Sequence, residues 1–236
     1  MKLYKLTEKD NTTKNNMKWK IGNKNIVRKC SNPELCSGDV IHAYKDLNFG
    51  LLMNPRHANI DNPNIYECKG KVVVEDWDKV GVFELTPIKK LKTPAWYKDE
   101  ETRKRVYIRF AILCAEAVLP IWNEKYPEDA RPRNAIEAAK KYLKTGKIDA
   151  DYAAYAAAYA ASAASAAAYA AYAASAAAYA AYAAYAADAA YAADAAYAAA
   201  NAAYAAANAA ANAAYRSNKE IDFIKLANEA IEIDGK

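Results

Sequence analysis

Two histidines and one nearby cysteine are the residues whose types could support metal or nucleophilic chemistry. The stretch LCSGDVIHAY brings Cys36, Asp39 and His42 close together in the sequence, and His57 is the second histidine of the chain. A thiolate and an imidazole can bind zinc or attack a carbonyl carbon. Their spacing here matches no pattern of metal ligands and no nucleophile–base pair. We therefore interpret both histidines as loop and strand residues with satisfied hydrogen bonds.

The acidic residues that follow are candidates for acid–base chemistry. Asp76 and Asp78 flank Trp77, and Glu67 and Glu75 precede them. General acid–base catalysis needs groups held near one reacting atom, and carboxylates this scattered define no such pair. The sequence also lacks a glycine-rich phosphate loop. We predict that the protein is not an enzyme and uses no cofactor and no metal.

Three arginines offer a different chemistry, the binding of an anion. Arg131 and Arg133 stand in EDARPR, which is typical of an exposed helix start, and Arg105 is a further candidate. Residues 1–150 carry 29 basic and 20 acidic side chains, a net charge of +9, and residues 151–236 carry four and eight, a net charge of −4. A mildly basic N-terminal part attracts anions. No cluster of Lys or Arg is dense enough to indicate a groove for long nucleic acid.

Residues 152–215 are almost entirely alanine, interrupted by Tyr, Ser, Asp or Asn at nearly every third or fourth position. Alanine has the highest helix propensity, and this tract contains neither glycine nor proline, so we predict α-helix. The interruptions recur every 3.3 residues on average, from 19 steps over 63 residues, and therefore drift around the helix. A single helix over residues 151–215 would be about 97 Å long. That length favours shorter helices that pack on one another or on a second copy.

The tyrosines of the tract are its most informative residues. A tyrosine ring offers flat apolar area and a hydroxyl group that forms hydrogen bonds. Three interpretations stay open. The rings could cover the alanine surfaces of neighbouring helices, or they could be aromatic platforms for bases or for a partner protein. The third interpretation is a repeat without a specific role or with an ice-binding face. The candidate binding residues are Tyr172, Tyr179, Tyr182, Tyr185 and Tyr191, together with Arg131 and Arg133.

Residues 1–97 are expected to form a β-rich domain. MKLYKLT alternates like a strand, and NIYECKGKVVVEDW and KVGVFELTPIKKLK are β-branched or aromatic runs interrupted by Gly70, Gly81 and Pro87. VIHAYKDLNFGLLM predicts a strand and a short helix, and MNPRHANIDNPN predicts a loop. Because a helical domain over residues 98–236 follows, we predict an α+β fold.

Helical spacing dominates the second domain. A first helix is predicted over residues 99–118, with Cys114 as a buried thiol inside it and Pro120 beyond its end. A second helix begins near RPRNAIEAAKKYLK and ends at Gly146, which suits a left-handed cap.

Capping residues indicate where the later helices begin. Asp149 or Asp151 offers an N-cap for the alanine tract. SNKE has the pattern of a capping box, with Ser217 as the cap and Glu220 three residues on. We therefore predict a final docking helix over residues 217–233.

The sequence also carries signals of cellular location. MKLYKLTEKD has no apolar signal-peptide core, and Cys30 and Cys36 lack a second close pair for a metal site. We expect free thiols in a reducing, cytoplasmic setting. The alanine tract lacks Leu, Ile, Val and Phe and gives little insertion energy, so we predict no membrane span.

A longer stretch resembles a known family. CAEAVLPIWNEKYPEDARPRNAIEAAKKYLKTGKID, followed by alanine-rich sequence, is similar to immunity proteins of bacterial polymorphic toxin systems over residues 106–215. The shared elements are Leu119-Pro120, Tyr126-Pro127, Arg131-Pro132-Arg133 and the AIEAA pattern. The N-terminal LCSGDVIHAYKDLNFGLLMNP resembles uncharacterised domains of phage and prophage proteins.

These resemblances imply a non-catalytic binding protein of phage or mobile-element origin, which neutralises a toxin or an immune effector in the cytoplasm of a bacterial host. One alternative is a sponge that sequesters a nucleotide signal between tyrosine rings and the basic N-terminal part. Another is a self-assembling structural helix. The expected partner is accordingly a protein effector or a nucleotide signal, with a homo-oligomer formed through the tract.

Overall fold

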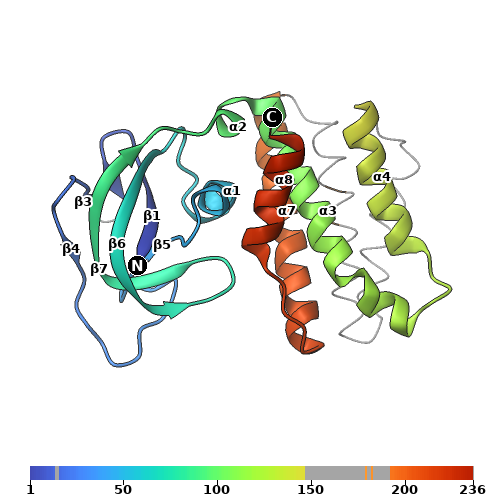
Figure 1. Ribbon diagram of the computed structural model, residues 1–236, viewed down its shortest axis with the longest axis horizontal. Coiled ribbons are helices and arrows are strands. Elements are labelled where there is room, and N and C mark those ends of the chain that lie inside the picture. The colour runs from blue at the N-terminus through green and yellow to red at the C-terminus, as the bar shows by residue number, and fades with distance from the viewer. Residues whose placement is uncertain (14–15, 147–178, 180–181, 183–191, 236) are drawn as a thin grey trace. The chain divides into compact units, whose positions relative to one another are not determined.

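A computed structural model describes residues 1–13, 16–146, 179, 182 and 192–235 of the 236-residue chain. The chain divides into two compact units, Met1–Lys98 and Asp99–Lys236. The first unit contains the strands and two short helices, and the described part of the second unit is helical (Figure 1). The predicted α+β fold, with a β-rich part followed by a helical part, is confirmed.

The first unit is built on one antiparallel sheet with the strand order β1-β6-β7-β4, and β5 also pairs with β7. Its strands are β1 (Lys2–Thr7), β4 (Asn25–Ile26), β5 (Ile41–Ala43), β6 (Asn64–Glu75) and β7 (Val80–Leu91). Strands β2 (Thr12–Thr13) and β3 (Met17–Lys18) form a separate small ladder. The strands predicted from MKLYKLT and from the two β-branched runs are therefore present.

Gly70, Gly81 and Pro87 lie inside β6 and β7, so the prediction that they interrupt the strands is wrong. The pairing of β6 with β7 contains register shifts, one next to Cys68 and others between Gly70 and Val74. Such irregularities accommodate residues that a regular ladder excludes. Pro87 lies opposite Cys68 at one of these shifts, where the absence of a backbone N–H is tolerated.

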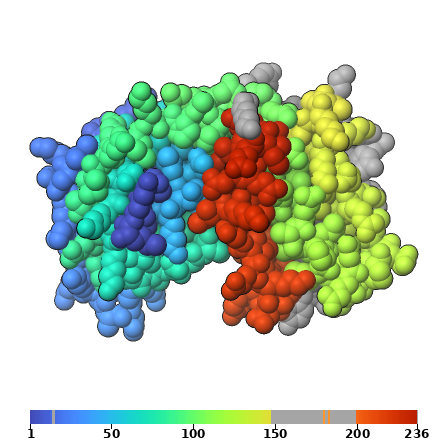
Figure 2. Space-filling view, in the orientation of Figure 1, coloured from blue at the N-terminus to red at the C-terminus, as the bar shows by residue number. Residues whose placement is uncertain are grey.

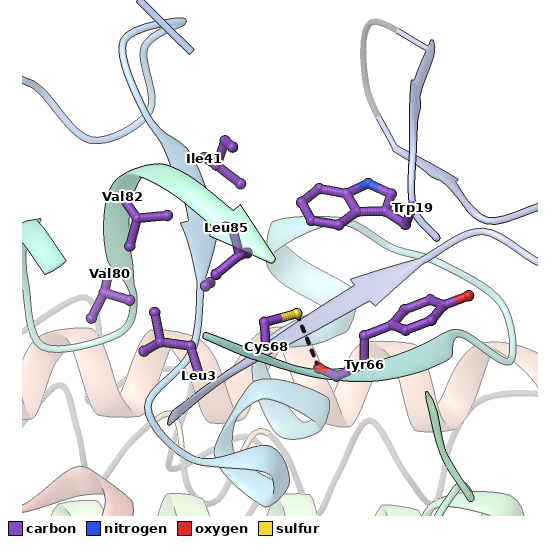
Figure 3. Packing of buried hydrophobic residues seen from close by; sticks show 9 residues of the cluster. Leu3, Trp19, Ile41, Tyr66, Cys68, Val80, Val82 and Leu85 are labelled. Carbon is purple, nitrogen blue, oxygen red and sulfur yellow. Dashed lines mark hydrogen bonds between the residues drawn. The ribbon is translucent and has the colours of Figure 1, made fainter. Parts of the chain in front are cut away.

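One core cluster fills a face of this sheet, as Figure 3 shows. It consists of Leu3, Trp19, Ile41, Ala43, Tyr66, Cys68, Val80, Val82 and Leu85. The Trp19 indole N–H donates to the Thr13 hydroxyl at 2.9 Å, so the ring is buried without losing its hydrogen bond. Burial raises the pKa of the Cys68 thiol to about 12, and the thiol therefore stays protonated.

Helix α1 (Leu47–His57) follows β5, as predicted, but it is longer than expected. The Asp46 carboxylate caps it by accepting a hydrogen bond from the Phe49 N–H at 2.8 Å. Residues 53–57 were expected in a loop, and that expectation is wrong. Pro55 lies within the last turn of this helix, although it has no backbone N–H to donate to the carbonyl four residues earlier.

The second unit is organised around α3 (Glu100–Lys125), which packs against α4 (Arg131–Thr145), α7 (Ala192–Arg216) and α8 (Phe223–Asp234). Asp99 caps α3 by accepting from the Thr102 N–H at 2.7 Å. The helix was expected to end before Pro120, but it continues through this residue to Lys125. By length and hydropathy α3 could cross a membrane, but 61% of its most apolar window is buried inside the protein, as in a core helix.

The ends of α4 and α8 test two capping predictions. Gly146 ends α4 in the left-handed conformation, with φ of 65°, as predicted. The capping box at Ser217 is wrong, because the Ser217 N–H donates to the Ala213 carbonyl and thereby closes α7. The true cap of α8 is Asp222, whose carboxylate accepts from the Lys225 N–H at 2.9 Å. The proposed caps at positions 149 and 151 lie outside the described residues.

Candidate binding surface

Helix α7 shows how the alanine tract packs. Over residues 199–216, where burial is described, the buried residues are all alanines: Ala199, Ala200, Ala202, Ala203, Ala206, Ala207, Ala209, Ala210, Ala213 and Ala214. The helix lies against α3, and Figure 2 shows α8 covering the same unit beside α3. Because alanine carries only a methyl group, helices can approach closely along such a surface. The prediction of α-helix with packed alanines is confirmed for residues 199–214.

Tyr179 and Tyr182 are the two candidate tyrosines that the structure describes. Both are helical, and their side chains are 39% and 52% exposed. Both residues are exposed, and they stand three positions apart in the sequence. We call this feature the Tyr179–Tyr182 pair. The other candidates, Tyr172, Tyr185 and Tyr191, lie outside the described residues.

Arg131 is engaged within its own chain. Its guanidinium donates to both carboxylate oxygens of Asp129, with Nε–Oδ1 at 2.9 Å and Nη2–Oδ2 at 2.6 Å. This partner holds the pKa of the Asp129 carboxyl below its usual range. The Trp122 indole N–H donates to the Asp129 carbonyl at 3.2 Å. Arg131 therefore fixes the turn between α3 and α4, and binding an external anion would require it to exchange this carboxylate.

Arg133, by contrast, is exposed on the outer face of α4. Lys141 and Lys144 are also exposed on this helix. Lys140 lies 2.8 Å from both Glu116 of α3 and Glu137 of α4, so it links the two helices. The outer face of α4 thus presents Arg133, Lys141 and Lys144 to a partner, on a helix that is held in place by ion pairs.

Two arginines of α3 fasten α8: Arg105, named above as an anion-binding candidate, and Arg109, which the sequence analysis missed. Arg105 Nη2 lies 2.6 Å from Asp234 Oδ1, and Arg109 Nε lies 2.6 Å from Asp234 Oδ2. Arg105 also donates to the Leu143 carbonyl at 2.8 Å, which connects α4 to the same group. The Asp234 side chain is only 3% exposed. The candidate anion-binding role of Arg105 is therefore replaced by a structural one.

The first unit contains a buried polar cluster around His57. The Tyr44 hydroxyl lies 3.0 Å from His57 Nδ1, and His57 Nε2 lies 3.0 Å from Asp78 Oδ2. Lys79 Nζ lies 2.8 Å from the other Asp78 oxygen. Although burial opposes it, hydrogen bonds from His57, Asp76 and Lys79 hold the pKa of Asp78 well below its usual range. The cluster fixes the end of α1 to the β6–β7 turn.

Both histidines have the satisfied hydrogen bonds that the sequence analysis expected. His42 Nε2 accepts from the Cys36 N–H at 3.0 Å, so the imidazole meets the backbone of Cys36. His57 ends a helix and does not lie in a loop. Among the described residues, no group of three His, Cys, Asp or Glu side chains is arranged to hold a metal ion.

Comparison with protein-family models finds a match over part of the chain. Residues 88–195 match the model of the family described as Immunity protein Imm5. The resemblance to immunity proteins is thus confirmed, with a match that begins in β7 and ends at residue 195, whereas the resemblance was assigned to residues 106–215. The matched range contains α3, α4 and the Tyr179–Tyr182 pair. No curated protein and no solved structure matches the chain.

Proposed function

We propose, from the match of residues 88–195 to the Imm5 immunity family, that this protein neutralises a protein toxin by forming a stoichiometric complex with it. The complex would act by covering a functional surface of the toxin, and no bond in either partner would be made or broken. We place this function in the cytoplasm of a bacterial host, and we attribute the gene to a phage or another mobile element.

The Tyr179–Tyr182 pair is the observation that supports a binding role for this region. Tyrosine is enriched in protein interfaces and in their energetic hot spots, because it combines a large apolar ring with a hydrogen-bonding hydroxyl. These two residues are exposed, stand three positions apart and fall within the family-matched residues. We assign them as aromatic anchors for the toxin.

Arg133, Lys141 and Lys144 on α4 add a charged component. Cations at the edge of an interface accelerate association and select partners of opposite charge more than they add affinity. We therefore expect the toxin to present acidic side chains to α4. The ion pairs of Lys140 hold α4 on α3, so this face is preformed before binding.

Two further functions make different predictions for the same tyrosines. A nucleotide sponge would stack a base on the rings, since aromatic side chains bind bases by their flat faces. A self-assembling protein would use them to contact a second copy. Both are outcomes of the following experiment.

The test is native mass spectrometry of the full chain purified from its natural host, followed by co-expression with any protein that it retains. The expected result is a retained protein that arrests growth when expressed alone and becomes harmless when this chain is present. Replacing both anchors, in Tyr179→Ser/Tyr182→Ser, should weaken the complex by at least about tenfold.

Tyr215 provides a matched control for these variants. It is a tyrosine of the same tract, is 86% exposed and lies outside the family-matched residues. Tyr215→Ser should leave the affinity and the protection unchanged. A chain that carries only a nucleotide, or only copies of itself, and that protects against no retained protein, would refute toxin binding.

A further inference from the structure

A surface of the first unit presents exposed isoleucines among cations. We call it the basic edge and define it as residues 20–29 together with residues 84–90 of β7. Ile21, Ile26 and Ile88 on this surface are 53%, 58% and 50% exposed. Large aliphatic side chains that remain in water at neighbouring positions are typical of a binding surface.

The backbone geometry brings these isoleucines together. The Gly22 N–H donates to the Pro87 carbonyl at 2.8 Å, which places Ile21 next to Ile88 along the two chains. Further along, Ile26 pairs with Glu84 in the β4–β7 ladder. Partners directly opposite in a ladder share a face of the sheet, so Ile26 and Glu84 lie on one face. Glu67 pairs with Lys89 and Cys68 with Pro87, so Ile88 is the extra residue of the register shift in β7.

Strand β4 also leaves an open side on the sheet. It is the last strand in the order β1-β6-β7-β4, and Figure 1 shows it at the outer margin of the sheet. The Val27 N–H donates to the Phe83 carbonyl at 2.9 Å. Peptide groups alternate in direction along an antiparallel ladder, so those of Ile26 and Arg28 point away from β7. An edge of this kind can pair with another extended chain.

The charge of the basic edge is strongly one-sided. Its residues include six Lys or Arg and one acidic residue, Glu84, for a net charge of +5. Glu84 is already engaged by Lys24 at 3.1 Å and by Lys29 at 3.4 Å. Lys20 and Arg28 are exposed and have no acidic partner among the described residues. The free charge on this surface is therefore positive.

We propose that the basic edge binds an acidic polypeptide segment in an extended conformation. The segment adds as a strand beside β4. On the face that carries Ile26 and Arg28, it packs an apolar side chain against Ile26 and places a carboxylate near Arg28, and a further carboxylate lies near Lys20. Main-chain hydrogen bonds would provide affinity, and the charges and isoleucines would provide specificity. This inference concerns the first unit and does not rest on the toxin-binding function proposed above.

The composition of the surface favours a polypeptide over other anions. Residues 20–29 and 84–90 contain no aromatic side chain on which a nucleic-acid base could stack. A phosphate backbone or a lipid headgroup would also make no use of the peptide groups of β4. An extended peptide satisfies all three features, namely the open strand, the isoleucines and the cations.

The test is fluorescence anisotropy of the full chain with a labelled eight-residue peptide of sequence Glu-Glu-Val-Val-Glu-Glu-Val-Val, which as a strand carries both Glu and Val on each face. We expect binding that weakens as salt is raised, since exposed charges are screened. Lys20→Glu/Arg28→Glu should weaken it by about tenfold or more at low salt. Ile26→Pro, which removes a backbone N–H facing the open side, should also abolish binding while the β4–β7 bonds remain.

The matched control is Lys219→Glu/Lys225→Glu at two exposed lysines of the second unit, which changes the net charge by the same amount and should leave peptide affinity unchanged. Circular dichroism checks that each variant is folded. If Ile26→Pro does not fold, Lys20→Glu/Arg28→Glu still tests the proposal. Any of three results would overturn the proposal. The peptide does not bind, or both charge variants weaken its binding equally, or an eight-nucleotide oligothymidylate or phosphatidylserine vesicles bind more tightly than the peptide.

Discussion

Asp234, the last residue of α8, accepts a 2.6 Å hydrogen bond from Arg105, which lies 129 positions earlier in α3. Arg109 engages the second oxygen of the same carboxylate. The carboxylate is buried, whereas the two arginine side chains are 37% and 21% exposed. The C-terminal helix is thereby held to the central helix at its far end, and α7 packs against that same central helix.

Asp234→Asn should loosen α8. The amide is nearly the same size but carries no charge, so the two arginines lose a charged acceptor. Because they are partly solvated, we expect a loss of about 2 kcal/mol in the free energy of unfolding, below the larger cost for fully buried pairs. Hydrogen–deuterium exchange of peptides from α8 measures this loosening. The control is Glu232→Gln, which replaces an exposed carboxylate on the same helix. Equal exchange rates of α8 in the two variants would contradict the role of Asp234.

Ala206→Leu should destabilise the helical unit. Ala206 is 0% exposed on α7, so the three added carbon atoms must be accommodated inside the protein. Overpacking of this kind costs about 1–3 kcal/mol. Urea denaturation followed by circular dichroism measures the change. Ala205→Leu places the same side chain at the adjacent, only partly buried position and should cost much less; a similar loss in both would indicate that the alanine surface is not closely packed.

Gly50→Ala should destabilise the first unit, although alanine is the better helix former. A Cβ atom at this position would lie 2.7 Å from a carbon of the Tyr44 ring, inside van der Waals contact. We expect a net loss of about 1–3 kcal/mol from this clash. Gly38→Ala is the control, since no atom lies within 4 Å of its added Cβ. Thermal unfolding should show a lower Tm for Gly50→Ala alone.

The stability of the first unit should rise between pH 8 and pH 10 because of Lys5. Burial lowers the pKa of this lysine to about 8, and its ammonium group donates to the His42 carbonyl at 2.8 Å. The unfolded chain keeps this proton up to about pH 10.4. Between these values the unfolded state binds more protons, so the free energy of unfolding increases with pH.

Lys5→Met should remove this pH-dependent rise and stabilise the first unit at pH 7 by roughly 2 kcal/mol or less. Urea denaturation at pH 7 and at pH 10 measures both effects. Lys9→Met, a change at an exposed lysine of the same segment, should retain the rise. A rise of equal size in the Lys5 variant would show that another group is responsible.

Local patterns in the sequence were sufficient for the fold class and for most of its elements. The alternation in MKLYKLT, the helical spacing after residue 99 and the glycine at position 146 each act over a few neighbouring residues, which is why they predict β1, α3 and the end of α4. The same local reasoning failed at Pro87 and Ser217, where the outcome depends on a partner strand or on the preceding helix.

By itself, the sequence determined that the chain combines a β-rich part with a helical part, that the alanine tract is helical over the described residues 192–215, and that residues 106–215 resemble immunity proteins. Only the tertiary structure decided that Arg131 is engaged by Asp129, that Asp234 fastens α8 and that an open, positively charged edge flanks the sheet. Propensity and periodicity are properties of adjacent residues, whereas these contacts and this exposure arise when residues distant in the chain are brought together by packing.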